Sequence, residues 1–184
     1  MKNIVLKYAL LLAVGFCLSG GSPARAADSP KRLTNTMIED FYSLSARMYK
    51  ADFDSFLLFM DQSMHPDVKG YSNVSIYLPG QPPLQSSEIS SKDKIMAAAR
   101  ENYDAMNKAT VQNVISGITI SPDGMKATVH DKNIFTGMIL PGSQGQLSAN
   151  GQGDCIDIVV LDTIKGYPQI LETNCKVIMK VGGF

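Results

Sequence analysis

Apolar residues recur at helical spacing in three segments of the first 110 positions. The segments cover about residues 36–50, 52–65 and 91–108, and each gathers its apolar side chains on one face, as an amphipathic helix does. Thr36 and Glu39 form a capping box at the start of the first segment. Asp52 is a capping residue for the second, and Pro66 ends it. The pattern therefore predicts three helices, each burying one face.

The hydrophobic pattern changes to alternation after Thr110. Alternating apolar and polar positions predict four long strands and one short earlier strand, at 110–120, 125–140, 155–163, 170–181 and 73–78. Ser121-Pro122-Asp123-Gly124 is a tight-turn sequence between the first two long strands. The stretches 79–90 and 141–153, rich in proline or glycine, predict loops.

The first 26 residues have the features of a secretory signal peptide. Lys2 and Lys7 precede an apolar run, Tyr8–Leu18, and Ala24 and Ala26 supply the small residues that precede a cleavage site. The run is shorter than the roughly 20 residues that span a bilayer. We expect cleavage near Ala26 and a periplasmic or secreted protein, with an uncleaved membrane anchor as the alternative.

Cleavage there would leave a flexible tail over residues 27–34 and a single domain over residues 35–184. The remaining 158 residues would carry 14 basic and 17 acidic side chains, with no basic run. A slightly negative chain of this kind lacks the electrostatic footprint of a nucleic-acid-binding protein. We therefore expect no nucleic-acid partner and no stable membrane insertion after cleavage.

Two cysteines, Cys155 and Cys175, would remain after cleavage. An oxidising compartment favours a disulfide between such a pair. A hairpin folded about Lys165-Gly166 brings the two positions opposite each other to within one residue, which is close enough to bridge. Two buried free thiols are the alternative.

The order of elements is helix, helix, short strand, helix and four long strands. This order, over about Asn35 to Val181, resembles the nuclear transport factor-like superfamily, which includes the SnoaL-like polyketide cyclases, the ketosteroid isomerases and many binding proteins. The helix-ending sequence Met64-His65-Pro66-Asp67 and the terminal sheet support the resemblance. The segment 67–90 departs from it, being longer and richer in proline. The resemblance implies an α+β, cone-shaped fold, with three helices packed on a curved, mostly antiparallel sheet and a ligand at the mouth of the cone.

Pairing the two cysteines also fixes which strand residues share a face. Asp157 then lies on the inner face, which also holds Leu171 and Thr173, where an apolar pocket raises the pKa of a carboxyl group. Carboxyl groups act as acids or bases in the ketosteroid isomerases that the chain resembles. Further candidates for a ligand pocket come from neighbouring elements: Tyr42, Tyr49, Tyr103 and Asn113.

The opposite face of the same strands is unusually apolar. It carries Ile156, Ile158, Val160 and Ile164, and an apolar surface of this kind is typical of an association site. The resemblance implies the same, since the outer sheet face often dimerises in that superfamily. We therefore expect a homodimer. The spacing of histidines and cysteines predicts no metal site, and no cofactor is expected.

These features favour a periplasmic, non-catalytic binding or assembly domain that recognises a small apolar ligand or an envelope protein. Two alternatives stay open. One is an isomerase-like or cyclase-like enzyme that uses a carboxyl group in the cone, with Asp157 as its catalytic candidate. The other is a subunit of an envelope secretion complex. An enzyme would place at least two further polar groups around Asp157 in a deep cone. A subunit would instead depend on its outer sheet face or on the 141–153 loop.

Overall fold

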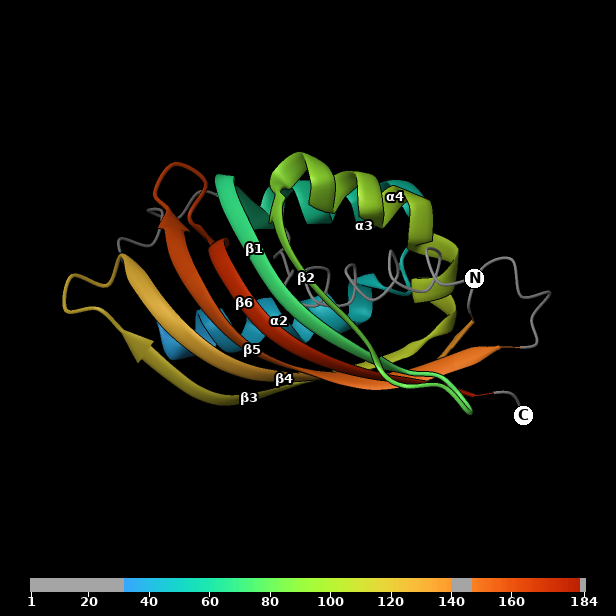
Figure 1. Cartoon of the computed structure of the whole chain (residues 1–184). Helices are drawn as coiled ribbons and strands as arrows, with labels where there is room; N and C mark the ends of the chain where they lie inside the picture. The colour runs from blue at the N-terminus through green and yellow to red at the C-terminus, as the bar shows by residue number, and fades with distance from the viewer. Residues whose placement is uncertain (1–31, 140–146, 183–184) are drawn as a thin grey trace.

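The computed structural model describes residues 32–139 and 147–182 and shows an α+β domain in which three helices cover one face of a curved sheet (Figure 1). The segment predicted as a signal peptide lies outside the described residues. The elements, in chain order, are α2 (Asn35–Met48), α3 (Phe53–Ser63), β1 (Met64–Tyr77), β2 (Leu84–Ser91), α4 (Lys92–Lys108), β3 (Thr110–Ile120), β4 (Lys126–Ile139), β5 (Ser148–Asp162) and β6 (Tyr167–Gly182).

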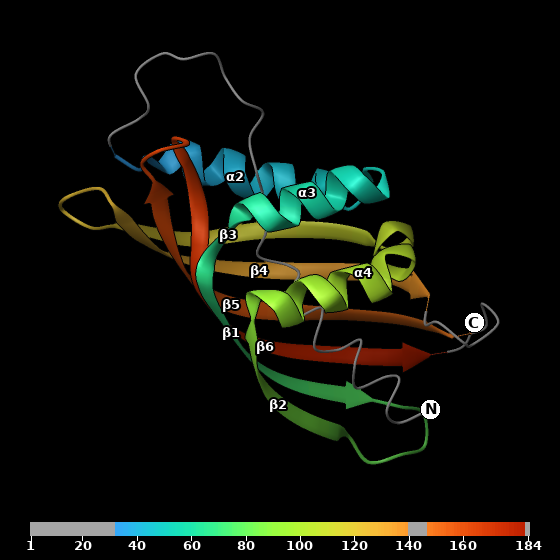
Figure 2. The same cartoon turned by 90° about the horizontal axis from the view of Figure 1, so that it is seen from above.

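The six strands form one sheet in the order β2-β1-β6-β5-β4-β3. All neighbours run antiparallel except β1 and β6, which run parallel. The view from above shows the helices lying over the concave side of the sheet (Figure 2). This confirms the predicted class, an α+β domain with three helices packed on a curved and mostly antiparallel sheet. The helix-covered side therefore holds the core.

The first helix begins two residues before the predicted capping box. Thr34, not Thr36, is the N-cap, and its hydroxyl oxygen accepts a hydrogen bond from the Met37 amide at 3.2 Å. Asp52 caps α3 as predicted, since its carboxylate accepts from the Ser55 amide at 2.9 Å. Both caps satisfy backbone donors that a helix start leaves without an intrahelical partner.

Residues 32–34, at the end of the predicted flexible tail, are held against the turn between β3 and β4. The Leu33 amide donates to the Gly124 carbonyl at 2.7 Å, and the Leu33 side chain is buried. The Arg32 guanidinium donates to the Pro122 carbonyl at 2.5 Å. The predicted tight turn thus also anchors the start of α2.

The first strand is much longer than the short strand expected over 73–78, because α3 passes directly into β1 at Met64. Pro66 therefore lies in a strand. The pairing of β1 with β6 shifts register between Met64 and Lys69, so a proline there removes no regular ladder bond. The next segment was expected to be a loop, yet β2 pairs with β1 over eight consecutive positions. Its serine-rich sequence lacks apolar alternation because β2 is an edge strand with little buried surface.

The strand β5 also begins earlier than expected, at Ser148 instead of Cys155. Glycines in this stretch suggested a loop, but Gly151 is required by a close approach between strands. A Cβ atom there would lie 2.4 Å from both the Ile178 carbonyl oxygen and the Phe135 ring. Residues 140–146, the rest of the predicted loop, lie outside the described residues.

Candidate functional site

Five polar side chains meet on the concave face of the sheet, under α2. They come from α2, β4, β5 and β6, and each is at most 3% exposed: Tyr42, Asp131, Asn133, Asp157 and Thr173. The strand register brings them together, because Val129 and Thr173 are the partners of Asp157 on either side of β5. We refer to these five residues as the inner polar cluster.

Tyr42 connects the helix layer to this cluster. Its hydroxyl donates to the Asp157 carboxylate oxygen Oδ2 at 2.5 Å, across 115 residues of sequence. Asn113 supports the same helix from β3, since its side-chain amide donates to the Tyr42 carbonyl at 3.3 Å. A short hydrogen bond to a buried carboxyl group is among the stronger polar contacts in a protein.

Asp131 and Asp157 form a coupled carboxyl pair. The pKa of Asp131 is raised from the ordinary value of 3.8 to about 9, first by burial and then by the negative charge of Asp157, with a smaller contribution from a hydrogen bond between the two side chains. The amide of Asn133 opposes this by donating to Asp131 Oδ2 at 2.7 Å. Two carboxylates this close in a buried site cannot both ionise readily. The pair therefore holds a proton at neutral pH.

The disulfide between Cys155 and Cys175 borders the cluster and confirms the predicted pairing over the alternative of free thiols. The two cysteines are direct register partners on β5 and β6. The Cys155 sulfur lies 3.4 Å from the Asn133 amide nitrogen, and the Cys175 sulfur lies 3.4 Å from the Thr173 hydroxyl. The covalent link thus holds together the two strands that carry Asp157 and Thr173.

Of the residues proposed for a pocket, Tyr42, Asp157 and Thr173 meet in the inner polar cluster. Tyr49 and Tyr103 belong to the helix layer, at the end of α2 and within α4. Tyr103 donates to the Ala51 carbonyl at 2.6 Å, and the Tyr49 ring packs 5.8 Å from that of Phe56. These two tyrosines therefore hold the helices against one another.

Sequence reasoning missed Asp131 and Asn133. The alternation of side chains along β4 could have indicated them. Val129 faces inward, and residues 131 and 133 lie on the same face of the strand. Leu171 was also assigned to the inner face. The β5–β6 register shifts at this point, so that Val159 pairs with Ile170, which is fully buried, and Leu171 is only half-buried.

The outer sheet face carries part of the apolar surface expected for association. Ile156 is 46% exposed, whereas Ile158 and Val160 are half-buried. Ile164 is exposed but lies in the turn between β5 and β6, not on the sheet, which corrects its predicted placement. A hollow of about 710 Å³ lies over this face; among the residues that line it are Val114, His130, Lys132, Asp154, Ile156 and Lys176.

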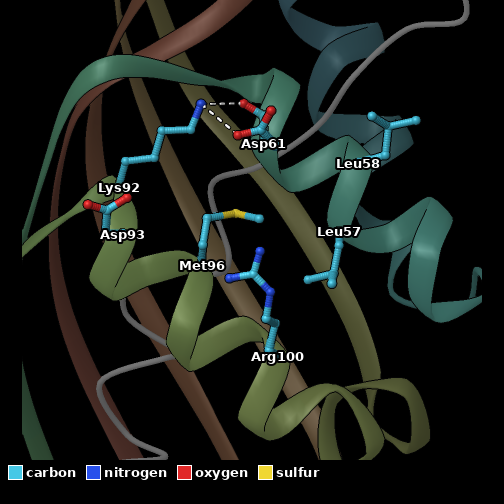
Figure 3. A pocket seen from close by; sticks show the side chains of 7 residues that line it. All are labelled: Leu57, Leu58, Asp61, Lys92, Asp93, Met96 and Arg100. Carbon is cyan, nitrogen blue, oxygen red and sulfur yellow. Dashed lines mark hydrogen bonds and ion pairs between the residues drawn. The ribbon is translucent and has the colours of Figure 1, made fainter.

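A second hollow, of about 390 Å³, lies between α3 and α4 (Figure 3). Its lining combines apolar and charged side chains: Leu57, Leu58, Asp61, Lys92, Asp93, Met96 and Arg100. The Lys92 ammonium group closes one end through an ion pair with Asp61 at 3.0 Å. It also donates to the Asp61 and Met64 carbonyls at the end of α3. We refer to this hollow as the helix cleft.

Two absences apply to the described part of the chain. Residues 32–139 and 147–182 contain no cluster of three or more histidine, cysteine or acidic side chains arranged to hold a metal ion. Within the same ranges, no helix has both the length and the apolar character needed to cross a membrane.

No family model matches the chain, and no curated protein matches it by sequence. Solved structures do match its fold. LinA is similar over 77% of this chain and 84% of its own, with a TM-score of 0.51 and 10% identity. A protein with a cystatin-like fold from Caulobacter vibrioides is similar over 77% and 87% of the two chains, with a TM-score of 0.49 and 12% identity. An NTF2-like protein from Cytophaga hutchinsonii is similar over 78% and 98%, with a TM-score of 0.48 and 12% identity. The likeness to LinA shows a shared fold, and the arrangement of three helices on a curved sheet is the one that the sequence resemblance predicts.

Proposed function

We propose that the protein is an exported, non-catalytic binding or assembly domain with a nuclear transport factor-like fold. One observation carries the proposal. Asp157, the carboxyl group best placed for chemistry, has no exposed surface and is held by the Tyr42 hydroxyl and by its pairing with Asp131. Its polar contacts are made inside the protein. Asp157 lines neither the helix cleft nor the hollow over the outer sheet face, although Asp131 is among the residues that line the latter.

Acid–base catalysis is the second candidate, because three proton-carrying groups converge on one point. Tyr42 and Asp131 both contact Asp157, and the raised pKa of Asp131 keeps a neutral acid available at neutral pH. A neutral acid beside a carboxylate can donate a proton to a carbonyl oxygen while the carboxylate accepts one from carbon. This candidate requires a substrate to reach a cluster that is at most 3% exposed.

The experiment that separates the two candidates is an isomerisation assay with a β,γ-unsaturated ketone, followed by ultraviolet absorbance. The purified protein and its Asp157→Asn variant would be compared at equal concentration. The proposed function predicts the same background rate for both. A rate for the unaltered protein at least a hundredfold above that of Asp157→Asn would contradict a non-catalytic role, since one general acid or base contributes about that much.

Export is the second part of the proposal and rests on the signal-peptide features of residues 1–26. Amino-terminal sequencing of the protein purified from its native host tests it. We expect a mature chain that starts at Ala27, recovered from the periplasm or medium. A chain that retains Met1 in the membrane fraction would support the uncleaved anchor, and with it the reading as a subunit of an envelope complex.

A further inference from the structure

We propose that the helix cleft is a binding site for an unbranched alkyl carboxylate, the chemistry of a free fatty acid. This rests on the proposed binding function and names its ligand class and location. The cleft volume, about 390 Å³, falls in the range of sites for small ligands. Three of the seven lining residues are apolar and four are charged, so the cleft suits a ligand that has both an apolar part and a charged part.

The apolar part of the cleft comes from both helices. Leu57 and Leu58 lie on α3, Met96 lies on α4, and the Leu58 side chain is 58% exposed. The helices run antiparallel. The Lys92–Asp61 ion pair joins them at one end, and the rings of Phe53 and Tyr103, 5.2 Å apart, join them at the other. An extended alkyl chain laid between the helices would cover exposed apolar surface, which stabilises binding.

The charged part of the cleft selects a carboxylate head group. The guanidinium of Arg100 extends into the space between Met96 and Leu57 (Figure 3), and no acidic partner for it occurs among the described residues. Lys92, by contrast, is neutralised by Asp61. A guanidinium group matches a carboxylate with two parallel hydrogen bonds. Arg100 is therefore the cation that the ligand would neutralise.

The position of the acids sets the orientation of the ligand. Asp93 lies beside Lys92, at the end of the cleft closed by the ion pair (Figure 3). A ligand carboxylate at that end would meet the like charges of Asp61 and Asp93, which destabilise binding. The head group would therefore lie at Arg100, and the alkyl chain would lie over Leu57 and Leu58.

The test is a titration of the full mature domain with sodium decanoate, followed by amide chemical shifts in two-dimensional NMR. Decyltrimethylammonium, which has the same alkyl chain and the opposite charge, is the ligand control. We expect saturable shifts centred on residues 57–61 and 92–100 with decanoate and weaker, non-saturating shifts with the cation. Equal responses to the two amphiphiles, or shifts centred on other elements, would overturn the proposal.

Two variants make the test specific. Arg100→Gln should weaken decanoate binding about fivefold, the effect of losing one exposed ion pair, and Arg100→Lys should recover part of it. Lys94→Gln removes one charge from the same helix outside the cleft and should leave binding unchanged. Leu58→Ser alters an exposed side chain, so the domain should stay folded while decanoate binding falls. Unchanged decanoate binding in both Arg100→Gln and Leu58→Ser would refute the site. That result would leave the question of catalysis open, because the isomerisation assay tests it separately.

Discussion

Two buried carboxyl groups determine how the interior of this domain responds to pH. Asp131 and Asp157 lie diagonally across β4 and β5 under the Tyr42 hydroxyl, and the pair holds a proton at neutral pH. A neutral, hydrogen-bonded acid is far less costly to bury than two carboxylates. The same proton makes the stability of the domain sensitive to alkali.

We predict that Asp131→Asn weakens the pH dependence of stability. The pKa of Asp131 is about 9 in the folded protein and 3.8 ordinarily, so the folded state binds the proton more tightly than the unfolded chain. The contribution of this proton to the stability of the folded state is therefore complete below pH 4 and is lost as the pH rises toward 9. The loss amounts to at most about 1.4 kcal/mol per pH unit. The asparagine variant carries no such proton.

Urea denaturation at pH 5, 6, 7 and 8 measures this effect as the difference in unfolding free energy between the protein and its variant. Asp104→Asn, at an exposed aspartate of α4, is the matched control, and its unfolding free energy should depend on pH as that of the unaltered protein does. If the unfolding free energy of Asp131→Asn depended on pH as that of the unaltered protein does, Asp131 would be ionised in the folded state from pH 5 to pH 8.

The Tyr42 hydroxyl has a separate, measurable role. Tyr42→Phe keeps the ring in the core but removes the donor to Asp157, so we expect a loss of about 1–3 kcal/mol in unfolding free energy at pH 7. Tyr77→Phe, on an exposed tyrosine of β1, should change it by less than about 0.5 kcal/mol. Equal effects in the two variants would mean that the hydrogen bond contributes nothing.

At the scale of elements, the helices and strands that could be predicted are those that bury one face, because burial of one face produces a periodic apolar pattern. The three helices and the strands from residue 110 onward each bury one face, and their periodicity shows it. β2 is an edge strand held by backbone hydrogen bonds to β1, which leave no mark on side-chain pattern. Asp157 could be placed because the cysteine pair fixed its phase. Alternation along β4 placed Asp131 on the same face as Val129, but its closeness to Asp157 depends on the β4–β5 register, which the sequence does not show.

Gly151 illustrates why the start of β5 was misread as a loop. Glycine often marks a turn, but here it allows close contact between strands. We predict that Gly151→Ala lowers the unfolding free energy by about 1–3 kcal/mol, because the new methyl group would overlap the Ile178 carbonyl and the Phe135 ring.

The matched substitution is Gly117→Ala on β3. A Cβ atom there would lie 3.9 Å from the His130 side chain, an ordinary contact. Thermal unfolding of both variants should show a lower midpoint for Gly151→Ala and a nearly unchanged one for Gly117→Ala. The prediction fails if both variants melt at the same temperature as the unaltered protein.

For the whole molecule, we propose that the outer sheet face forms a homodimer. Ile156 lies in the hollow over that face with Lys132, Asp154 and Lys176 around it, and Lys132 pairs with Asp154 at 3.5 Å. An apolar centre with a charged rim is the usual anatomy of a protein interface.

Sedimentation equilibrium at micromolar concentration tests this proposal. We expect the mass of two chains for the unaltered protein and of one chain for Ile156→Lys, which places a charge at the centre of the interface. Ile89→Lys, at an exposed isoleucine of the edge strand β2, should remain dimeric. A single-chain mass for the unaltered protein would exclude the dimer.

We infer that the inner carboxyl pair is a closed, proton-holding part of the core and not a solvent-accessible acid–base site. Carbon-13 NMR of the aspartate carboxyl groups, titrated from pH 3 to pH 10 and assigned with Asp131→Asn and Asp157→Asn, measures it directly. We expect one proton to stay on the pair through neutral pH and to leave near pH 9. Titration of both carboxyl groups near pH 4, as in exposed aspartates, would contradict it.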